Sequence, residues 1–476
     1  MMFITHILFI LTLGFYLITT LQWFSYRFER VFFHFTKPLW HALYLFLPIV
    51  LYFGLNALNE LYFYAYFYLI YLPLLFFWHK KLDKKLVFTA RVKRFFVILV
   101  LTTIFIDILL YEKAAVLPLF LPLAVTFLIS FSFEKYQSLL FIKQAAKKLE
   151  GMPNLTIIEI TASYGKTSIK NFLYQILEKE FKCYKTPRSV NTLMGLVKDI
   201  NEELPKDTEI YIAEAGARQS GDIEEITSFL QPSIVIVGEI GEQHIEYFKT
   251  IENIRKTKLE ALASSNLKMA FVHSSAKDSG DEKTVIYNSN LSGVEANLES
   301  LKFDMKFDGE IYRFEAPILG KFNASNLAAC INTAKYLGMD IKEIQNQVAN
   351  LQSVEHRLQK IEAGGKFIID DSFNGNLEGM SESYNLVVEY ENRKVVITPG
   401  IVEATKEMNE NLAKRINEVF DLVIITGELN ADIFKSIIDE KKLIVLKDKS
   451  ELTKVLGEKT RAGDLILFSN DAPNFI

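Results

Sequence analysis

The stretch that decides the fold reads Leu155-Thr-Ile-Ile-Glu-Ile-Thr-Ala-Ser-Tyr-Gly-Lys-Thr-Ser168, and Ile169-Lys-Asn-Phe-Leu-Tyr-Gln-Ile-Leu177 follows it. Its first half is a β-branched, apolar run that predicts a buried strand. The second segment places its apolar residues at helical spacing. Between them lies a tight loop that ends in Gly165-Lys166-Thr167. A strand, a loop with Gly-Lys-Thr and a helix are together typical of a phosphate-binding loop.

In such a loop, backbone N–H groups and the helix N-terminus hold anionic oxygens. We expect Lys166 to reach the outer phosphates of a nucleotide and the Thr167 hydroxyl to bind Mg²⁺. The full pattern G-x-x-x-x-G-K-[ST] requires glycine at position 160, where this chain has Ile160. On these residues alone two interpretations stay open, nucleotide binding and an incidental strand–turn–helix.

The composition separates the chain from several classes of protein. Half of its 476 residues are hydrophobic, and its 38 Phe and 21 Tyr crowd the first third. The net charge of −4 leaves no basic footprint for nucleic acid, so we expect no nucleic-acid partner. Cys183 and Cys330 sit in no metal-binding spacing, and we expect both to be core residues of a protein from a reducing compartment.

Residues 1–135 predict a membrane domain, because crossing a bilayer takes about 20 predominantly apolar residues. Five segments fit this description: Phe3–Leu21, Pro38–Leu55, Leu61–Trp78, Phe95–Tyr111 and Ala114–Phe133. Lys and Arg are frequent after the first, third and fifth segments and rare after the other two. By the positive-inside rule, the N-terminus is outside and everything after residue 135 is cytoplasmic. The lipid bilayer is then a partner.

Asp107 lies inside the fourth of these segments. A carboxylate within a membrane marks a functional site by default. The alternative, which we favour because no second buried charge accompanies it, is a position near the outer end of the span that reaches the interface.

The rest of the chain predicts an α/β architecture. Residues 136–153 form a connector helix, and strands then alternate with helices in two sets. The sets predict a central domain over residues 154–354, with a P-loop ATPase-like parallel sheet, and a Rossmann-like C-terminal domain over residues 355–476. The expected strands are Thr208–Glu214, Ser233–Val237 and Met269–His273 in the first set, and Lys366–Asp370, Lys394–Thr398, Leu422–Thr426, Lys442–Leu446 and Asp464–Phe468 in the second. Asp308-Gly309 predicts a hairpin turn.

Polar residues follow several of these strands, at the sheet edge where ligands bind in open parallel sheets. Glu214 ends one strand and, with Thr167, can complete a Mg²⁺ site. His244 and Lys258 follow the next strand, although each by itself is more typical of a surface residue. The run Asp370-Asp371-Ser-Phe-Asn374-Gly-Asn376 is richer in Asp and Asn than a turn requires, and a turn with a cap stays the alternative.

Taken together, these residues resemble the Mur ligases over about residues 150–476. Thr161-Ala-Ser-Tyr-Gly-Lys-Thr-Ser168 is similar to the ATP loop of the family, and Asn191-Thr-Leu-Met-Gly195 to its substrate loop. Glu214-Ala-Gly-Ala217 resembles its Mg²⁺-binding strand end. Gly320-Lys-Phe-Asn-Ala-Ser-Asn326 resembles the motif whose asparagine contacts adenine. Asp371-Ser-Phe-Asn-Gly-Asn376 is typical of the branch that adds D-Ala-D-Ala.

The resemblance implies an ATP-dependent amide ligase that adds D-Ala-D-Ala to UDP-N-acetylmuramoyl-tripeptide through an acyl phosphate, with ATP and Mg²⁺ as cofactors. It implies ATP binding by Ser163, Gly165, Lys166, Thr167, Ser168, Asn323, Asn326, Arg357 and Asp371. It implies substrate binding by Asn191, Thr192, Asn374 and Asn376. It implies metal binding by Thr167, Glu214, His244 and a carbamylated Lys258, and catalysis by Lys166, His244 and Lys258.

The chain also departs from the family pattern. Ala162 stands at a usual glycine of the ATP loop, Phe322 at a usual histidine, and Leu467-Phe-Ser-Asn470 lacks a usual lysine. The membrane domain takes the place of the uridine-binding domain of the family. The resemblance then implies a multi-pass protein of the bacterial inner membrane, beside other membrane-associated cell-wall precursor enzymes. Two alternatives stay open: an amide ligase of the superfamily with a different amine or a lipid-linked acceptor, and a transporter or sensor with a regulatory nucleotide-binding domain.

Overall fold

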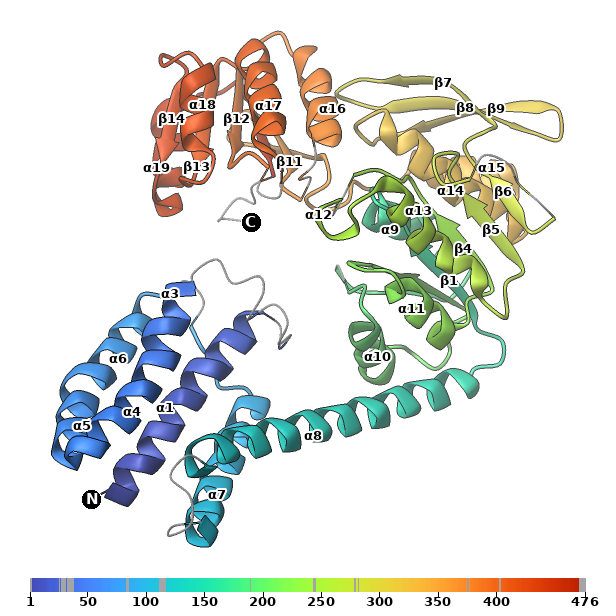
Figure 1. The fold of residues 1–476 in the computed structure, drawn as a ribbon. Helices are drawn as coiled ribbons and strands as arrows, with labels where there is room; N and C mark the ends of the chain where they lie inside the picture. Colours follow the sequence, from blue (N-terminus) through green and yellow to red (C-terminus); the bar gives the residue numbers. More distant parts are fainter. Residues whose placement is uncertain are drawn as a thin grey trace. The chain divides into compact units, whose positions relative to one another are not determined.

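The structure is a computed structural model that describes residues 2–24, 26, 31, 38–82, 85–110, 117–188, 190–242, 245–277, 280, 282–373, 375, 377–401 and 404–470. The chain divides into two compact units, Met1–Leu140 and Phe141–Ile476. The first unit is helical, and the second contains every strand among the described residues (Figure 1).

The first unit is built from apolar helices. They are α1 (Met2–Trp23), α3 (Pro38–His41), α4 (Leu47–Leu58), α5 (Glu60–Tyr66), α6 (Leu72–Lys80), α7 (Ala90–Leu110) and the start of α8 (Leu117–Glu150). Two π-helical turns, Ala42–Phe46 and Phe67–Tyr71, join α3 to α4 and α5 to α6. Aromatic side chains fill the interior, where the Phe9 ring packs edge-on against Phe63 and Phe67.

Within the described residues, four helical segments are long and apolar enough to cross a membrane: Phe3–Trp23, Leu39–Leu58, Glu60–Lys80 and Pro118–Glu150. They coincide with the first, second, third and fifth predicted spans. Helix α7, which contains residues 95–110 of the fourth, is not among them, because Arg91, Lys93, Arg94 and Asp107 leave too short an uncharged stretch. Helix α8 contains the end of the last span and continues unbroken through residues 136–150 of the expected connector.

Asp107 on α7 has a buried partner that the sequence did not reveal. Its side chain is 4% exposed, and its Oδ1 lies 3.2 Å from Nε2 of His6 on α1. The other nitrogen of His6, Nδ1, lies 2.8 Å from the hydroxyl of Tyr52 on α4. The expectation that no second buried ionisable group accompanies Asp107 is therefore wrong.

The second unit opens with a parallel sheet, called here the central sheet, whose strand order is β2-β3-β1-β4-β5-β6. Its strands are β1 (Thr156–Thr161), β2 (Cys183–Lys185), β3 (Ile210–Glu214), β4 (Ile234–Val237), β5 (Met269–Val272) and β6 (Thr284–Ile286). Alternation along β1 sends Ile158 and Ile160 to one face and Ile157 to the other. The register pairs Ile160 with Glu214, so β1 and β3 end side by side.

Helices cover both faces of the central sheet. Helices α9 (Lys166–Leu177) and α14 (Phe322–Tyr336) share the core on one face. Helices α10 (Leu193–Glu202), α11 (Asp222–Leu230) and α13 (Ile251–Leu259) share the core on the other. The short helix α12 (Ile245–Phe248) precedes α13, and a 3-10 turn, Glu260–Ala263, follows it. The end of α8 is anchored here as well, because Lys148 Nζ donates to the Ile200 carbonyl in α10 at 2.6 Å.

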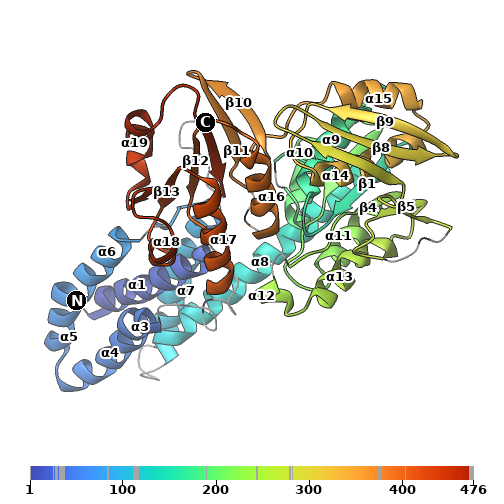
Figure 2. The same cartoon turned by 90° about the horizontal axis from the view of Figure 1, so that it is seen from above.

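A small antiparallel sheet, β7 (Leu291–Ala296), β8 (Leu301–Phe307) and β9 (Glu310–Ala316), follows the central sheet. Helix α15 (Ile341–Ala349) lies beside β9 in both views (Figure 2). The predicted hairpin is confirmed: β8 and β9 meet at Asp308 and Gly309, whose φ angles of 53° and 92° are typical of the turn that Asp-Gly forms.

The C-terminal sheet has the order β10-β11-β15-β12-β13-β14, with only the β10–β11 pair antiparallel among its described pairs. Its strands are β10 (Gln359–Ala363), β11 (Lys366–Asp371), β12 (Lys394–Thr398), β13 (Leu422–Thr426), β14 (Leu443–Leu446) and β15 (Leu465–Ser469). Helices α16 (Leu377–Val388), α17 (Lys406–Val419) and α18 (Ala431–Ile437) pack on one face, and α19 (Leu452–Lys459), after a 3-10 turn at Lys449–Glu451, packs on the other. Helices on both faces confirm the predicted α/β architecture.

Candidate functional site

The loop between β1 and α9 has the geometry expected of a phosphate-binding loop. Gly165 adopts a φ of 79°, and α9 begins at the next residue, so the N–H groups of its first turn face the loop. A Cβ atom at Gly165 would run into the side chain of Asn326 on α14. Only glycine therefore fits at position 165. The loop and Asn326, both predicted to bind ATP, lie in direct contact.

The Lys166 side chain folds back over this loop. Its Nζ donates to the carbonyl oxygens of Ala162, at 2.7 Å, and Ser163, at 2.9 Å. Desolvation lowers the pKa of Lys166 to about 8, the negative charge of Glu214 opposes this shift, and the positive charge of Arg357 adds to it. An incoming phosphate would supply the negative charge that this ammonium group needs.

Glu214, at the end of β3, contacts one residue predicted to bind the metal and one predicted to bind the substrate. It is buried, and its Oε2 accepts a hydrogen bond from the Thr167 hydroxyl at 3.1 Å. Its Oε1 accepts from Nδ2 of Asn191 at 3.2 Å. Hydroxyl and carboxylate oxygens are ligands that suit Mg²⁺. Thr167 and Glu214 therefore fit the expected metal, and Asn191 lies beside them.

Lys170 belongs to the same cluster and was missed from the sequence. Its side chain is 1% exposed, and its Nζ lies 3.1 Å from Glu214 Oε2 and donates to the Arg188 carbonyl. A signal was present, because Lys170 shares the face of α9 that carries the apolar residues Leu173 and Leu177. A charged residue on the buried face of a helix generally has a partner.

Lys258, on α13, is 3% exposed, so the alternative of a solvated surface lysine is wrong. Desolvation lowers the pKa of Lys258 to about 7, and the positive charge of Lys166 adds to this effect. The negative charges of Asp222, Glu260 and Glu214 oppose it. About half of the amine is therefore neutral near pH 7, and the neutral form is the nucleophilic form of a lysine.

Three of the predicted residues, His244, Asn374 and Asn376, lie outside the described residues. Among the residues that are described, no cluster of three or more His, Cys, Asp or Glu side chains forms a metal site. The expected second metal, which depends on His244, stays a prediction.

The remaining predicted residues of the central sheet are placed by local hydrogen bonds. Asn326 Nδ2 donates to Asn323 Oδ1 at 2.8 Å, and Asn323 Nδ2 donates to the Leu319 carbonyl at 2.7 Å. Ser163 Oγ donates to the Gly241 carbonyl at 3.1 Å, whereas Ser168 is buried in the first turn of α9. Thr192 caps α10, where its hydroxyl accepts from the Gly195 N–H.

Arg357 and Asp371 lie together at the start of the C-terminal sheet. Asp371, the last residue of β11, is buried, and its Oδ1 accepts from the Leu358 N–H at 3.2 Å. The Arg357 guanidinium donates to the Phe373 carbonyl. The negative charge of Asp371 supports the charged form of Arg357 against its desolvation, which lowers the pKa of Arg357.

The chain is similar to known proteins over the region that forms this site. Residues 160–334 match the model of the Mur ligase middle domain. The chain is 28% identical over 295 residues to a UDP-N-acetylmuramoyl-tripeptide–D-alanyl-D-alanine ligase from Borreliella burgdorferi, covering 58% of this chain and 63% of that protein. The Bacillus subtilis ligase of the same name is 25% identical over 353 residues, which cover 69% of this chain and 75% of that protein.

Solved structures agree with this fold. The MurF ligase from Thermotoga maritima, in complex with ADP, superposes with a TM-score of 0.61 at 25% identity, covering 70% of this chain and 80% of that one. Folylpolyglutamate synthase from Thermotoga maritima, at 16% identity, shares the fold with a TM-score of 0.52, covering 70% of this chain and 90% of that one. The chain spans 63% of the length of the Borreliella protein.

Proposed function

We propose that this chain, which contains the middle domain of the Mur ligases, is an ATP-dependent amide ligase that joins D-Ala-D-Ala to UDP-N-acetylmuramoyl-tripeptide. The observation that carries the proposal is the cluster of Thr167, Glu214 and Asn191 beside the Gly165 loop. It brings a phosphate loop, a metal-binding pair and a substrate residue to one edge of the central sheet. The names of the similar ligases support the choice of substrates.

The reaction begins with attack of the peptide carboxylate on the γ-phosphorus of ATP. A carboxylate oxygen bonds to phosphorus, the bond to the β-phosphate oxygen breaks, and ADP leaves. Such a transfer is accelerated by positioning and by offsetting charge. Lys166 and Arg357 would be the cations that offset the charge of the transferred phosphoryl group. Thr167 and Glu214 would hold Mg²⁺, which would supply further positive charge at the phosphates.

The second half of the reaction forms the amide bond. The amine of D-Ala-D-Ala attacks the acyl carbon, loses a proton, and inorganic phosphate leaves. Asn191, hydrogen-bonded to Glu214, stands at the loop that we assign to substrate binding. Its backbone is fixed as well, because the Gly216 N–H donates to the Asn191 carbonyl at 2.7 Å.

We assign to Lys258 a carbamate that completes a metal site together with His244. Addition of CO₂ requires a neutral amine and converts a cation into a carboxylate-like ligand. The burial of Lys258 supports this assignment. Incubation of the purified protein with ¹³C-bicarbonate should give an NMR signal from the carbamate carbon. The Lys258→Arg variant should lack this signal. A signal of equal size in both proteins contradicts the assignment.

We further propose that the first unit is an anchor in the cytoplasmic membrane, with residues 154–354 and 355–476 as two catalytic domains on the cytoplasmic side. The four long apolar helical segments among the described residues support this location. After lysis, the full chain should stay with the membrane pellet through a carbonate wash and enter solution only with detergent. Release by carbonate alone contradicts a membrane-spanning anchor.

Phosphate release from ATP tests the ligase activity of the full chain in detergent. The two substrates are supplied separately and together, and Lys166→Ala is compared with Lys182→Ala, an exposed lysine of the same domain. Release that needs both substrates and is lost only in Lys166→Ala supports the proposal. Release with another amine in place of D-Ala-D-Ala would identify a different amide ligase. Release without either substrate would indicate a transporter or sensor.

A further inference from the structure

Arg357 stands in a turn with unusual backbone geometry. Its N–H donates to the Val354 carbonyl at 3.0 Å, which closes a tight turn over Glu355 and His356. His356 adopts a φ of 61° and Leu358 a φ of 47°. Residues other than glycine adopt this left-handed conformation only rarely. The turn therefore needs interactions that hold it in place.

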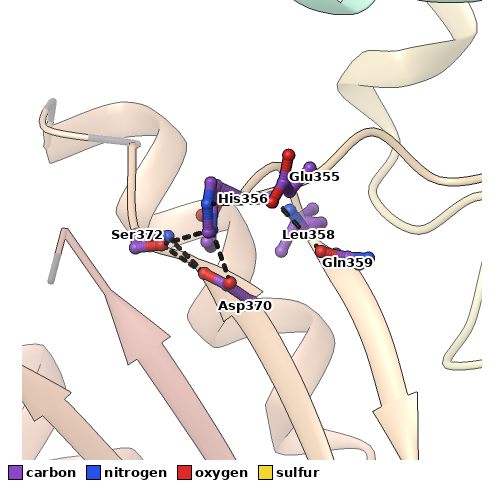
Figure 3. A network of polar contacts seen from close by, with 7 residues as sticks. Glu355, His356, Leu358, Gln359, Asp370 and Ser372 are labelled. Carbon is purple, nitrogen blue, oxygen red and sulfur yellow. Dashed lines mark hydrogen bonds and ion pairs between the residues drawn. The ribbon is translucent and has the colours of Figure 1, made fainter. Parts of the chain in front are cut away.

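The His356 side chain supplies one of these interactions (Figure 3). Its Nδ1 lies 2.7 Å from Oδ2 of Asp370, a residue of β11 that is completely buried. Oδ1 of Asp370 accepts from the Ser372 N–H at 3.1 Å and from the Ser372 hydroxyl. Since a carboxylate only accepts hydrogen bonds, Nδ1 of His356 carries the hydrogen.

The same three residue types form the catalytic triad of serine hydrolases, but their arrangement here is different. Ser372 Oγ lies 3.3 Å from Nδ1 of His356, the nitrogen that also meets Asp370. In a triad, the serine and the aspartate contact opposite nitrogens of the imidazole. The network therefore serves to fix the imidazole rather than to activate a nucleophile.

The residue after Asp370 secures the other side of the turn. Asp371 Oδ1 accepts from the Leu358 N–H at 3.2 Å, and its Oδ2 accepts from the Ser383 hydroxyl at 2.6 Å. The neighbours of Arg357 on both sides are thus tied to two consecutive aspartates of β11. This arrangement fixes the direction in which the Arg357 backbone presents its side chain.

We propose that His356 is a positioning residue of the nucleotide site: its imidazole, held by Asp370, maintains the left-handed turn that presents Arg357 to the phosphates of the nucleotide. The inference rests on the proposed function, which assigns Arg357 to ATP. A glycine at position 356 would adopt the left-handed conformation without strain. Histidine adopts it while its imidazole is held by Asp370, so the geometry assigns the positioning role to the imidazole and not to the backbone alone.

The test compares His356→Gly with His356→Asn in the full chain in detergent. The glycine variant removes the imidazole and relieves the backbone, so we expect its melting temperature to stay near that of the unsubstituted protein. We expect its KM for ATP and its Kd for ATP to rise about tenfold, which corresponds to about 1.4 kcal/mol. The KM for D-Ala-D-Ala should stay within about twofold. Asparagine, which tolerates the left-handed region and can donate a hydrogen bond, should recover part of the ATP affinity.

The matched control is Gln231→Gly, another left-handed position, with a φ of 46° at the end of α11. It should leave the KM for ATP unchanged. Unchanged ATP binding in both His356 variants, or equal losses for ATP and D-Ala-D-Ala, overturns the inference and leaves the proposed function standing. An unsubstituted protein that binds neither ATP nor ADP overturns the proposed function, and the inference with it.

Discussion

Nζ of Lys170 lies 3.1 Å from Oε2 of Glu214, and both side chains are almost completely buried. The same carboxylate oxygen accepts a hydrogen bond from the Thr167 hydroxyl. The charge of Glu214 is thus balanced before any ligand arrives. A buried pair of this kind is costly to break from one side, because the remaining charge keeps its desolvation penalty.

Lys170→Met should therefore lower the stability of the second unit by roughly 3–5 kcal/mol, measured by thermal or denaturant unfolding in detergent. The matched control is Lys182→Met, whose ion pair with Asp207 is exposed and which should leave stability nearly unchanged. The double variant Lys170→Met/Glu214→Leu should recover much of the loss. If Lys170→Met and Lys182→Met unfold alike, the pair does not stabilise the fold.

Gly165→Ala should destabilise the phosphate loop in two ways, through backbone strain and through a steric clash. The alanine adopts a left-handed conformation, which costs about 1–2 kcal/mol, and it also meets the Asn326 side chain. Gly221→Ala is the matched control, because Gly221 has a φ of 88° and open space around its Cβ position. We expect Gly165→Ala to lose more stability than Gly221→Ala and to lose ATP binding. Adding Asn326→Ala should return part of the stability but not the binding. Equal stability losses in the two glycine variants would rule out the steric clash.

Glu159 gives the second unit a dependence on pH. Burial raises the pKa of Glu159 from 4.5 to about 8, while the hydrogen bond from Thr227 opposes the shift. The folded state therefore binds this proton more tightly than the unfolded chain. The stabilising contribution is complete below pH 4.5 and is lost as the pH rises to 8, at about 1.4 kcal/mol for each unit between the two pKa values.

Glu159→Gln removes this titration and keeps the shape of the side chain. Unfolding measured at several pH values should show the variant gaining stability relative to the unsubstituted protein as the pH rises from 4.5 to 8. Glu180→Gln, on an exposed glutamate of the same domain, is the control and should show no such trend. A constant difference across this range would mean that Glu159 does not titrate there.

The pair of His6 and Asp107 should respond unequally to the loss of either partner. His6→Leu leaves a buried carboxylate whose Oδ2 has no hydrogen-bond partner among the described residues. Asp107→Leu removes the carboxylate and leaves an imidazole whose Nδ1 keeps its contact with the Tyr52 hydroxyl. His6→Leu should therefore reduce the melting temperature in detergent more than Asp107→Leu. The double variant should be more stable than His6→Leu. The reverse order would show that the pair is not charged.

Much of the second unit could be predicted from the sequence because its signals are local. The strands of the C-terminal sheet are short apolar runs between polar turns, and Lys394–Thr398 and Leu422–Thr426 coincide with their predicted bounds. The meeting of Thr167 and Glu214 followed from the rule that parallel strands end at one edge. Strands β2, β6, β7 and β10 were missed because they are short or have few fully buried residues.

The partners of buried charges could not be predicted, because they depend on packing between distant segments. The sequence shows a lysine at position 170 and an aspartate at position 107, but not that Glu214 and His6 face them.

The two aspartates of β11 make the pairing of two strands part of the proposed nucleotide site. Asp370 is opposite Phe468 and Asp371 opposite Ser469 in the parallel pair with β15. Because successive side chains of a strand point to opposite faces, a slip of one residue would exchange their directions. His356 and Leu358 would then lose their carboxylates together. An insertion or deletion within β11 or β15, far in sequence from the Gly165 loop, would thus act as a mutation of the proposed ATP site.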